Sequence, residues 1–139
     1  MKYLTLLIGL LTISSFSYGA GLPISTSPDG ASVYIISPEN GEIVGELLTV
    51  KFGLQGMGIS PAGLDKANTG HHHLIIDGKK LPDFDKAMGS EVVHFGGGQT
   101  QKTIKLSKGK HTLQLILGNY LHVPHNPPVV SEKITVYVK

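Results

Sequence analysis

The chain has 139 residues, which is the length of a single domain. It contains no Cys, no Trp and no Arg, and its 12 Lys against 10 acidic residues leave a formal charge of +2. A nucleic-acid-binding protein normally presents a strongly basic face, so this composition argues against nucleic acid as a partner. Eighteen Gly and eight Pro are typical of a turn-rich β domain, whereas seven His stand out.

Residues 1–19 have the pattern of a signal peptide. Lys2 is followed by an apolar stretch that is short for a bilayer span, and the small residues Ser17 and Gly19 predict cleavage after Gly19. An uncleaved anchor helix is the alternative. Cleavage would leave no membrane span, and the chain has no Cys for a lipid anchor or a disulfide. We therefore expect a protein of the periplasm, or a secreted one.

Residues 20–32 are small, polar and aperiodic, which predicts a flexible leader before a domain spanning 33–139. In that domain, short apolar or alternating segments are separated by turns that contain Gly or Pro, and none has the 3.6-residue period of a helix. This pattern predicts an all-β fold, an Ig-like antiparallel β-sandwich of about seven strands. The first predicted strand begins near Val33, and the others are 47–54, 71–77, 91–95, 101–106, 111–117 and 133–138.

Two connections, 55–70 and 118–132, are longer than a compact sandwich needs, and long loops tend to carry function. If successive strands run antiparallel, six of the seven histidines fall on one rim of the sandwich. His111 starts a strand at the opposite end. This assignment requires that no single extra strand intervene between Asp77 and Glu91.

The segment 71–73 is a run of three histidines at the start of a predicted strand. His71 and His73 project to the same face, about 6.5 Å apart in Cα, so two imidazoles can hold one ion there. His72 points to the other face with Leu74 and Ile76, which predicts that it packs inward or donates a hydrogen bond to a residue that binds the metal.

The other rim histidines complete a predicted metal site. His94 ends a neighbouring strand, and His122 and His125 flank a turn that Pro124 stiffens, which reduces the entropy lost on ligation. We expect one shared site built from residues that come together only in the folded chain: His71, His73, His94 and one or both of His122 and His125.

The donor set predicts copper first and zinc second. Imidazole suits Cu, Zn, Ni and Fe, and a chain without Cys offers no thiolate. Met57, in the first long loop, could add a soft thioether that favours Cu(I). Protons compete for the same lone pairs, so affinity is expected to fall below about pH 6.5.

Other interpretations stay open. The imidazoles could hydrogen-bond to loop carbonyls and brace the loops, or titrate together as a proton-sensing surface. The long loops could recognise a peptide or glycan in a metal-free interaction module. A metalloenzyme with three His ligands and an open position would need a base such as Glu132 or Asp77. No nucleophile-elbow pattern surrounds any Ser, and the glycines at 96–98 indicate a turn.

Several motifs together resemble the DUF4399 family. They are SPENGEIV, TVKFGLQGMGISPAG, GHHHLIID (70–77), HFGGGQT (94–100), GKHTLQLILGN (109–119) and HVPHNPPVVSEKITVYV (122–138). The resemblance covers nearly all of 37–138 and implies an exported bacterial domain of about this length. It brings no catalytic residues, so the metal hypothesis depends on the histidine geometry. The expected function is that of a periplasmic metal carrier or buffer, with a periplasmic metal-handling protein as a possible partner.

Overall fold

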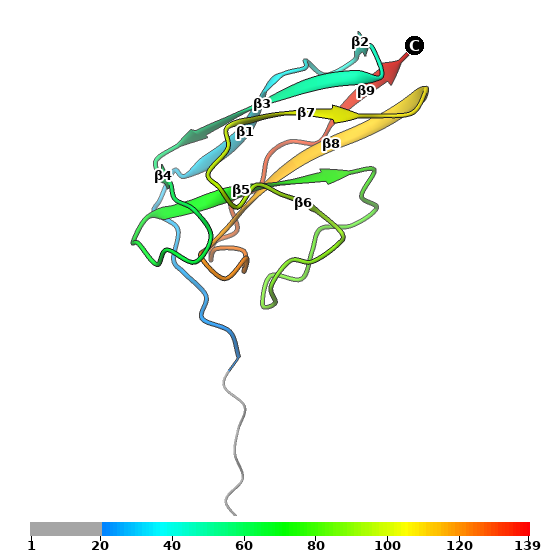
Figure 1. The fold of residues 1–139 in the computed structure, drawn as a ribbon. Helices are drawn as coiled ribbons and strands as arrows, with labels where there is room; N and C mark the ends of the chain where they lie inside the picture. The colour runs from blue at the N-terminus through cyan, green and yellow to red at the C-terminus, as the bar shows by residue number, and fades with distance from the viewer. Residues whose placement is uncertain (1–20) are drawn as a thin grey trace, which may run out of the picture.

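The computed structural model describes residues 21–139, so the predicted signal peptide lies outside the described residues. Residues 21–139 form nine strands and no helix, arranged as two stacked sheets (Figure 1). The strands are β1 (Ser32–Ser37), β2 (Glu42–Val44), β3 (Leu47–Gln55), β4 (Gly58–Ile59), β5 (Thr69–Ile76), β6 (Val93–His94), β7 (Gln101–Lys105), β8 (Gly109–Gly118) and β9 (Ile134–Val138).

The smaller sheet has the order β1–β3–β7, and both of its pairings are antiparallel. Its central strand, β3, alternates from Leu47 to Phe52: Leu48, Val50 and Phe52 are buried, whereas Thr49 and Lys51 are exposed. Because successive side chains of a strand point to opposite faces, β3 presents one apolar face to the second sheet.

The larger sheet has the order β2–β9–β8–β5–β4, and β6 also pairs with β5. Its centre is the antiparallel pair β5–β8, whose register runs from His71 opposite Gly118 to Ile76 opposite Leu113. Two short pairings, β2 with β9 and β4 with β5, are parallel. The β5–β8 pair fixes the site described below, because it sets which β5 side chains face the interior.

One apolar core fills the space between the sheets. Full burial of an aliphatic side chain contributes about 1.5–3 kcal/mol, and a chain without disulfides depends on such burial. The aliphatic core residues with no exposed surface are Val50, Leu74, Leu113, Leu115, Leu117 and Val136.

A second, smaller apolar cluster lies on the outer face of the larger sheet. It comprises Ile75 of β5, Ile116 of β8 and Met88 of the connection 77–92, with partly buried residues packed against them. This connection and the loop 119–133 both run below β5 in Figure 1. The outer face of β5 is therefore covered by long loops.

Part of the segment expected to be a flexible leader is bonded to the loop that follows β8. The Ser27 N–H donates to the Asn126 carbonyl (3.2 Å), the Asn126 N–H donates to the Ser25 carbonyl (3.0 Å), and Ser27 Oγ donates to the Pro127 carbonyl (2.6 Å). Ser27 is buried. These bonds attach residues 23–27 to the body of the domain.

The predicted all-β sandwich is confirmed, and each of the seven predicted strands has an observed counterpart. The sequence does not predict β2 and β4, which have three and two residues and pair in parallel, so no hairpin turn marks them. No strand lies between Asp77 and Glu91, as the assignment of the histidines requires. Residues 21–139 contain no helix long and apolar enough to cross a bilayer.

Candidate metal centre

Four histidines converge beside the first half of β5. His71, His73, His94 and His122 each offer a ring nitrogen, and these nitrogens all lie within 4.8 Å of one another. They come from two strands and a loop, and His71 and His122 are 51 positions apart in the chain. We call these four residues the histidine cluster; it could hold a metal ion.

Strand β5 supplies the buried half of the cluster. His71 and His73 share a face because they are two positions apart, and their ring centroids are 4.6 Å apart. Neither has any exposed surface. His72, between them, points into the core, where its ring centroid lies 5.1 Å from that of Phe52. The cluster therefore occupies the outer face of the larger sheet rather than a rim of the sandwich.

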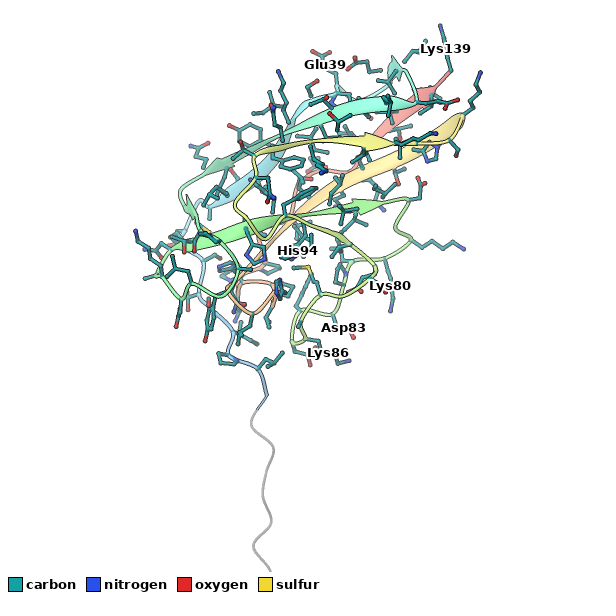
Figure 2. The ribbon with its side chains drawn as sticks, viewed as in Figure 1. Glu39, Lys80, Asp83, Lys86, His94 and Lys139 are labelled. Atoms are coloured by element: carbon teal, nitrogen blue, oxygen red, sulfur yellow. The ribbon has the colours of Figure 1, made fainter. Side chains whose placement is uncertain are left out.

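Strand β6 adds the most exposed member of the cluster. β6 pairs antiparallel with β5, and His94 stands directly opposite His73. The His94 ring centroid lies 4.9 Å from that of His71 and 5.1 Å from that of His73. Figure 2 shows His94 just below β5, on the side away from β3 and β7. Cross-strand pairing, which the sequence does not specify, thus brings this residue to the site.

His122 completes the cluster from a strained turn. Its φ of 66° lies in the left-handed region, which is costly for any residue but Gly and is often found at functional sites. Asn119, 1% exposed, holds this turn: its Oδ1 accepts the N–H groups of Leu121 (2.9 Å) and Val123 (3.0 Å), and its carbonyl accepts that of His122 (2.9 Å). The turn directs the His122 ring toward His94, with a centroid distance of 4.4 Å.

Ring nitrogens of the cluster are spaced as the ligands of one ion would be. His71 Nε2 lies 3.1 Å from His122 Nδ1 and 3.1 Å from His94 Nε2. Two nitrogens bound about 2.0–2.1 Å from a tetrahedral ion are about 3.3 Å apart. Both distances are close to that spacing, and all four residues offer a nitrogen within 4.8 Å of the others.

Several buried nitrogens of the cluster have no hydrogen-bond partner. They are Nδ1 of His71 and both ring nitrogens of His73. An unsatisfied buried polar group costs about 1–3 kcal/mol, so most such groups in native proteins have a partner. An ion bound in the cluster would give His73 one.

Burial and repulsion between neighbouring positive charges favour the neutral form of His71, His73 and His94. Burial, aided by the charges of His122 and His94, lowers the pKa of His71 to about 4. Burial and the neighbouring histidines lower the pKa of His73 further, and burial followed by His122 lowers the pKa of His94. A neutral imidazole keeps a lone pair for a metal, so these three ligands need lose no proton at neutral pH.

His125, the other ligand expected from the loop, lies outside the histidine cluster. Its Nε2 is 3.1 Å from the Thr69 carbonyl and its Nδ1 is 3.5 Å from the Leu117 carbonyl. Burial lowers its pKa, although both hydrogen bonds oppose that shift. The ring is 1% exposed and fastens the loop to β5 and β8. Here the sequence-based alternative, an imidazole that braces a loop through carbonyls, describes the geometry.

His111 lies beyond the opposite end of β5, as its strand position predicts. Its Nδ1 is 2.7 Å from Asp77 Oδ2, and its Nε2 is 2.9 Å from the Ser107 carbonyl and 3.3 Å from Ser107 Oγ. Both ring nitrogens lie within hydrogen-bond distance of oxygen atoms, which occupy the positions a metal ion would need. Asp77, one candidate base for an enzyme, is thereby engaged away from the cluster.

The two methionines of residues 21–139 pack in different apolar clusters. Met57 packs against the main core. Met88 lies at the cluster instead: its N–H donates to the His122 carbonyl (2.9 Å). The sequence around Met88 has no periodicity that could have indicated this.

The fold and the cluster define an all-β sandwich domain with a four-histidine group that could hold a metal ion. Residues 50–139 match the family described as Domain of unknown function (DUF4399), and the chain belongs to that family. The match confirms the resemblance and includes all four cluster histidines. Neither the curated proteins nor the solved structures contain a significant match.

Proposed function

We propose that this chain is an exported domain that binds a transition metal, copper first and zinc second, and serves as its carrier or buffer. The observation that carries the proposal is the contact of His71 Nε2 with two other ring nitrogens, each at 3.1 Å. One ring nitrogen can donate or accept only one hydrogen bond in the ring plane. Hydrogen bonding therefore accounts for one of the two contacts, whereas an ion accounts for both.

Donor chemistry supports copper as the first choice. Affinity for nitrogen donors rises along the first-row divalent metals to Cu(II) and then falls at Zn(II). The chain has no Cys, so metal sites that are built from thiolate ligands are excluded. Zinc is second because it accepts imidazole ligands in tetrahedral geometry.

The uneven burial of the cluster supports a carrier or buffer. His71 and His73 are buried, His122 is partly exposed and His94 is exposed. An ion could enter and leave on the His94 side by exchanging one accessible ligand, whereas a structural zinc site is closed. We propose a periplasmic metal-handling protein as the exchange partner. Location in the periplasm, or secretion, rests on the signal-peptide pattern of residues 1–19.

Calorimetry of the mature chain, without fused sequences, tests the proposal. Cu(II), Zn(II) and, under anaerobic conditions, Cu(I) are titrated into the wild type, the double variant His71→Ala/His73→Ala and the control His111→Ala. We expect binding by the wild type and the control and its loss in the double variant. Millimolar or weaker binding of all three ions would overturn the proposal.

The rival function, a metal-free module that recognises a peptide or glycan, predicts a different outcome. In that case the double variant and the wild type would carry the same metal content after purification from the native source. Elemental analysis of both proteins distinguishes the two functions.

A further inference from the structure

The backbone and the side chain of Met88 each lie near a different member of the histidine cluster. Its backbone N–H donates to the His122 carbonyl (2.9 Å), which fixes the position of its Cα next to the strained turn. Its side chain and the ring of His73 both reach Gly118: a Cβ on Gly118 would lie 2.5 Å from His73 Cε1, 3.1 Å from His73 Nδ1 and 2.9 Å from Met88 Cε. The thioether sulfur is one covalent bond from that Cε.

The surroundings of Met88 keep its side chain on this face. Met88 is 8% exposed and packs in the outer apolar cluster with Ile75 and Ile116. Ile116 is the cross-strand partner of His73, and Ile75 follows His73 by two positions on the same face. A buried methionine beside a buried, unpaired imidazole can bring a soft donor to an ion without exposing it to water.

The ligands of the histidine cluster are uncharged, and this favours an ion of low charge. The cluster, as far as residues 21–139 show, consists of imidazoles without a carboxylate, and the chain has no thiolate. A divalent ion would keep its full charge beside the buried His71 and His73, and the cost of placing a charge in a poorly solvated site rises steeply with that charge. A monovalent ion with a preference for soft donors avoids most of this cost.

We propose that the histidine cluster preferentially takes Cu(I) and that Met88 contributes its thioether to that ion. The inference rests on the proposed function and specifies the ion of the same site. Met57 does not share this role, because it packs against the main core. Loading involves only ligand exchange on Cu(I) supplied as such, so no electron transfer is required.

Anaerobic competition for Cu(I) against a chromophoric chelator tests the proposal on the mature chain. The variant is Met88→Leu, which nearly conserves side-chain volume, and the matched control is Met57→Leu. We expect Met88→Leu to weaken Cu(I) binding at least about 10-fold and to change Zn(II) binding little, because thioether sulfur favours Cu(I). Met57→Leu should leave both affinities unchanged, and X-ray absorption of the Cu(I) form should show a sulfur ligand that Met88→Leu removes.

Three results would overturn the inference. The first is an unchanged Cu(I) affinity in Met88→Leu, and the second is an equal loss of Cu(I) and Zn(II), which would indicate only a packing role. The third is weaker binding of Cu(I) than of Zn(II) by the wild type. In each case the chain still binds metal, so the proposed function survives. If the wild type binds no ion, the proposed function itself fails.

Discussion

Histidines near the two ends of β5 lie in opposite electrostatic environments. At one end, burial and the surrounding imidazoles lower the pKa of His71 to about 4. Beyond the other end, the hydrogen bond to Asp77 raises the pKa of His111, and the Ser107 carbonyl adds to the shift. The residue type is the same, so the difference comes from what each ring faces.

This comparison identifies which histidines are available to an ion. The His111 nitrogens both face oxygen acceptors, and the hydrogen bond to Asp77 favours the protonated ring. Burial favours the neutral form of His71, His73 and His94, and ring nitrogens of the cluster face one another. An imidazole surrounded by imidazoles is a candidate ligand, whereas one that faces a carboxylate and a carbonyl is a structural donor.

The largest effect that can test this distinction is stabilisation by a bound ion. An ion that binds only the folded chain, at about 1,000 times its Kd, stabilises it by about 4 kcal/mol. We expect Zn(II) to raise the Tm of the wild type and of His111→Ala, and to leave that of His73→Ala nearly unchanged. Thermal unfolding with and without Zn(II) measures this. A full rise in His73→Ala would contradict the assignment.

Acid should destabilise the metal-free protein through the cluster. The pKa of His71 falls from 6.5 to about 4 on folding, so below pH 6.5 the unfolded chain binds more protons than the folded one. Stability is therefore lost as the pH drops from 6.5 toward 4, by roughly 2 kcal/mol at pH 5 from His71 alone. Urea unfolding at pH 7 and pH 5 measures the loss, which should be smaller in His71→Phe. Equal stability at both pH values would count against a buried, neutral cluster.

Gly70 precedes His71 in β5, so a side chain added at Gly70 should disturb only the end of β5 that carries the histidine cluster. A Cβ there would lie 2.6 Å from the Gly118 carbonyl oxygen and 2.8 Å from His125 Cε1, and the backbone atom cannot move aside. Overpacking of this kind costs about 1–3 kcal/mol, so Gly70→Ala should lower the free energy of unfolding by that amount. Gly45→Ala is the matched control, since nothing lies within 4 Å of its added Cβ. Equal stability of the two variants would show that the close approach is not tight.

The smallest expected loss of stability concerns the Asp77–His111 pair, beyond the other end of β5. Asp77→Asn removes the ion pair with His111, in which the Asp77 side chain is 48% exposed, so the loss should be about 1 kcal/mol. Burial raises the pKa of Asp77, but the hydrogen bonds from Thr112 and His111 outweigh it and the net shift is downward. The pair therefore stabilises the fold between two limits: the contribution is lost as the pH rises through the raised pKa of His111, and as it falls through the lowered pKa of Asp77.

Nuclear magnetic resonance checks the same variant directly. The His111 pKa should return toward 6.5 in Asp77→Asn, while the metal affinity stays at the wild-type value. An affinity that falls with the loss of the pair would mean that the two ends are coupled.

Much of the fold follows from local sequence pattern. The alternation in β3 and the apolar run of β8 identify central strands, because the side-chain period of two separates a buried face from an exposed one. The same period places His71 and His73 on one face and His72 on the other. The short strands β2 and β4 have no such pattern, since they exist through pairing with distant partners.

The rest of the site depends on tertiary contacts that no local pattern specifies. His122 and His125 flank the same turn, yet a positive φ held by Asn119 directs one to the cluster while carbonyls of β5 and β8 engage the other. The sequence indicated Met57, which lies in the first long loop, and did not indicate Met88. Only the packing of a long loop on the outer face of the sheet distinguishes them.

The bonds between residues 23–27 and the turn that carries His122 affect how the protein should be produced. Asn119 Nδ2 donates to the Pro23 carbonyl (2.9 Å) and to Ser25 Oγ (3.2 Å), so this segment begins close to the cluster. A polyhistidine tag fused ahead of it would hold foreign imidazoles near the native ones and compete for the same ion. Lys139 lies at the other pole of the molecule (Figure 2), so a removable tag there would leave the site undisturbed.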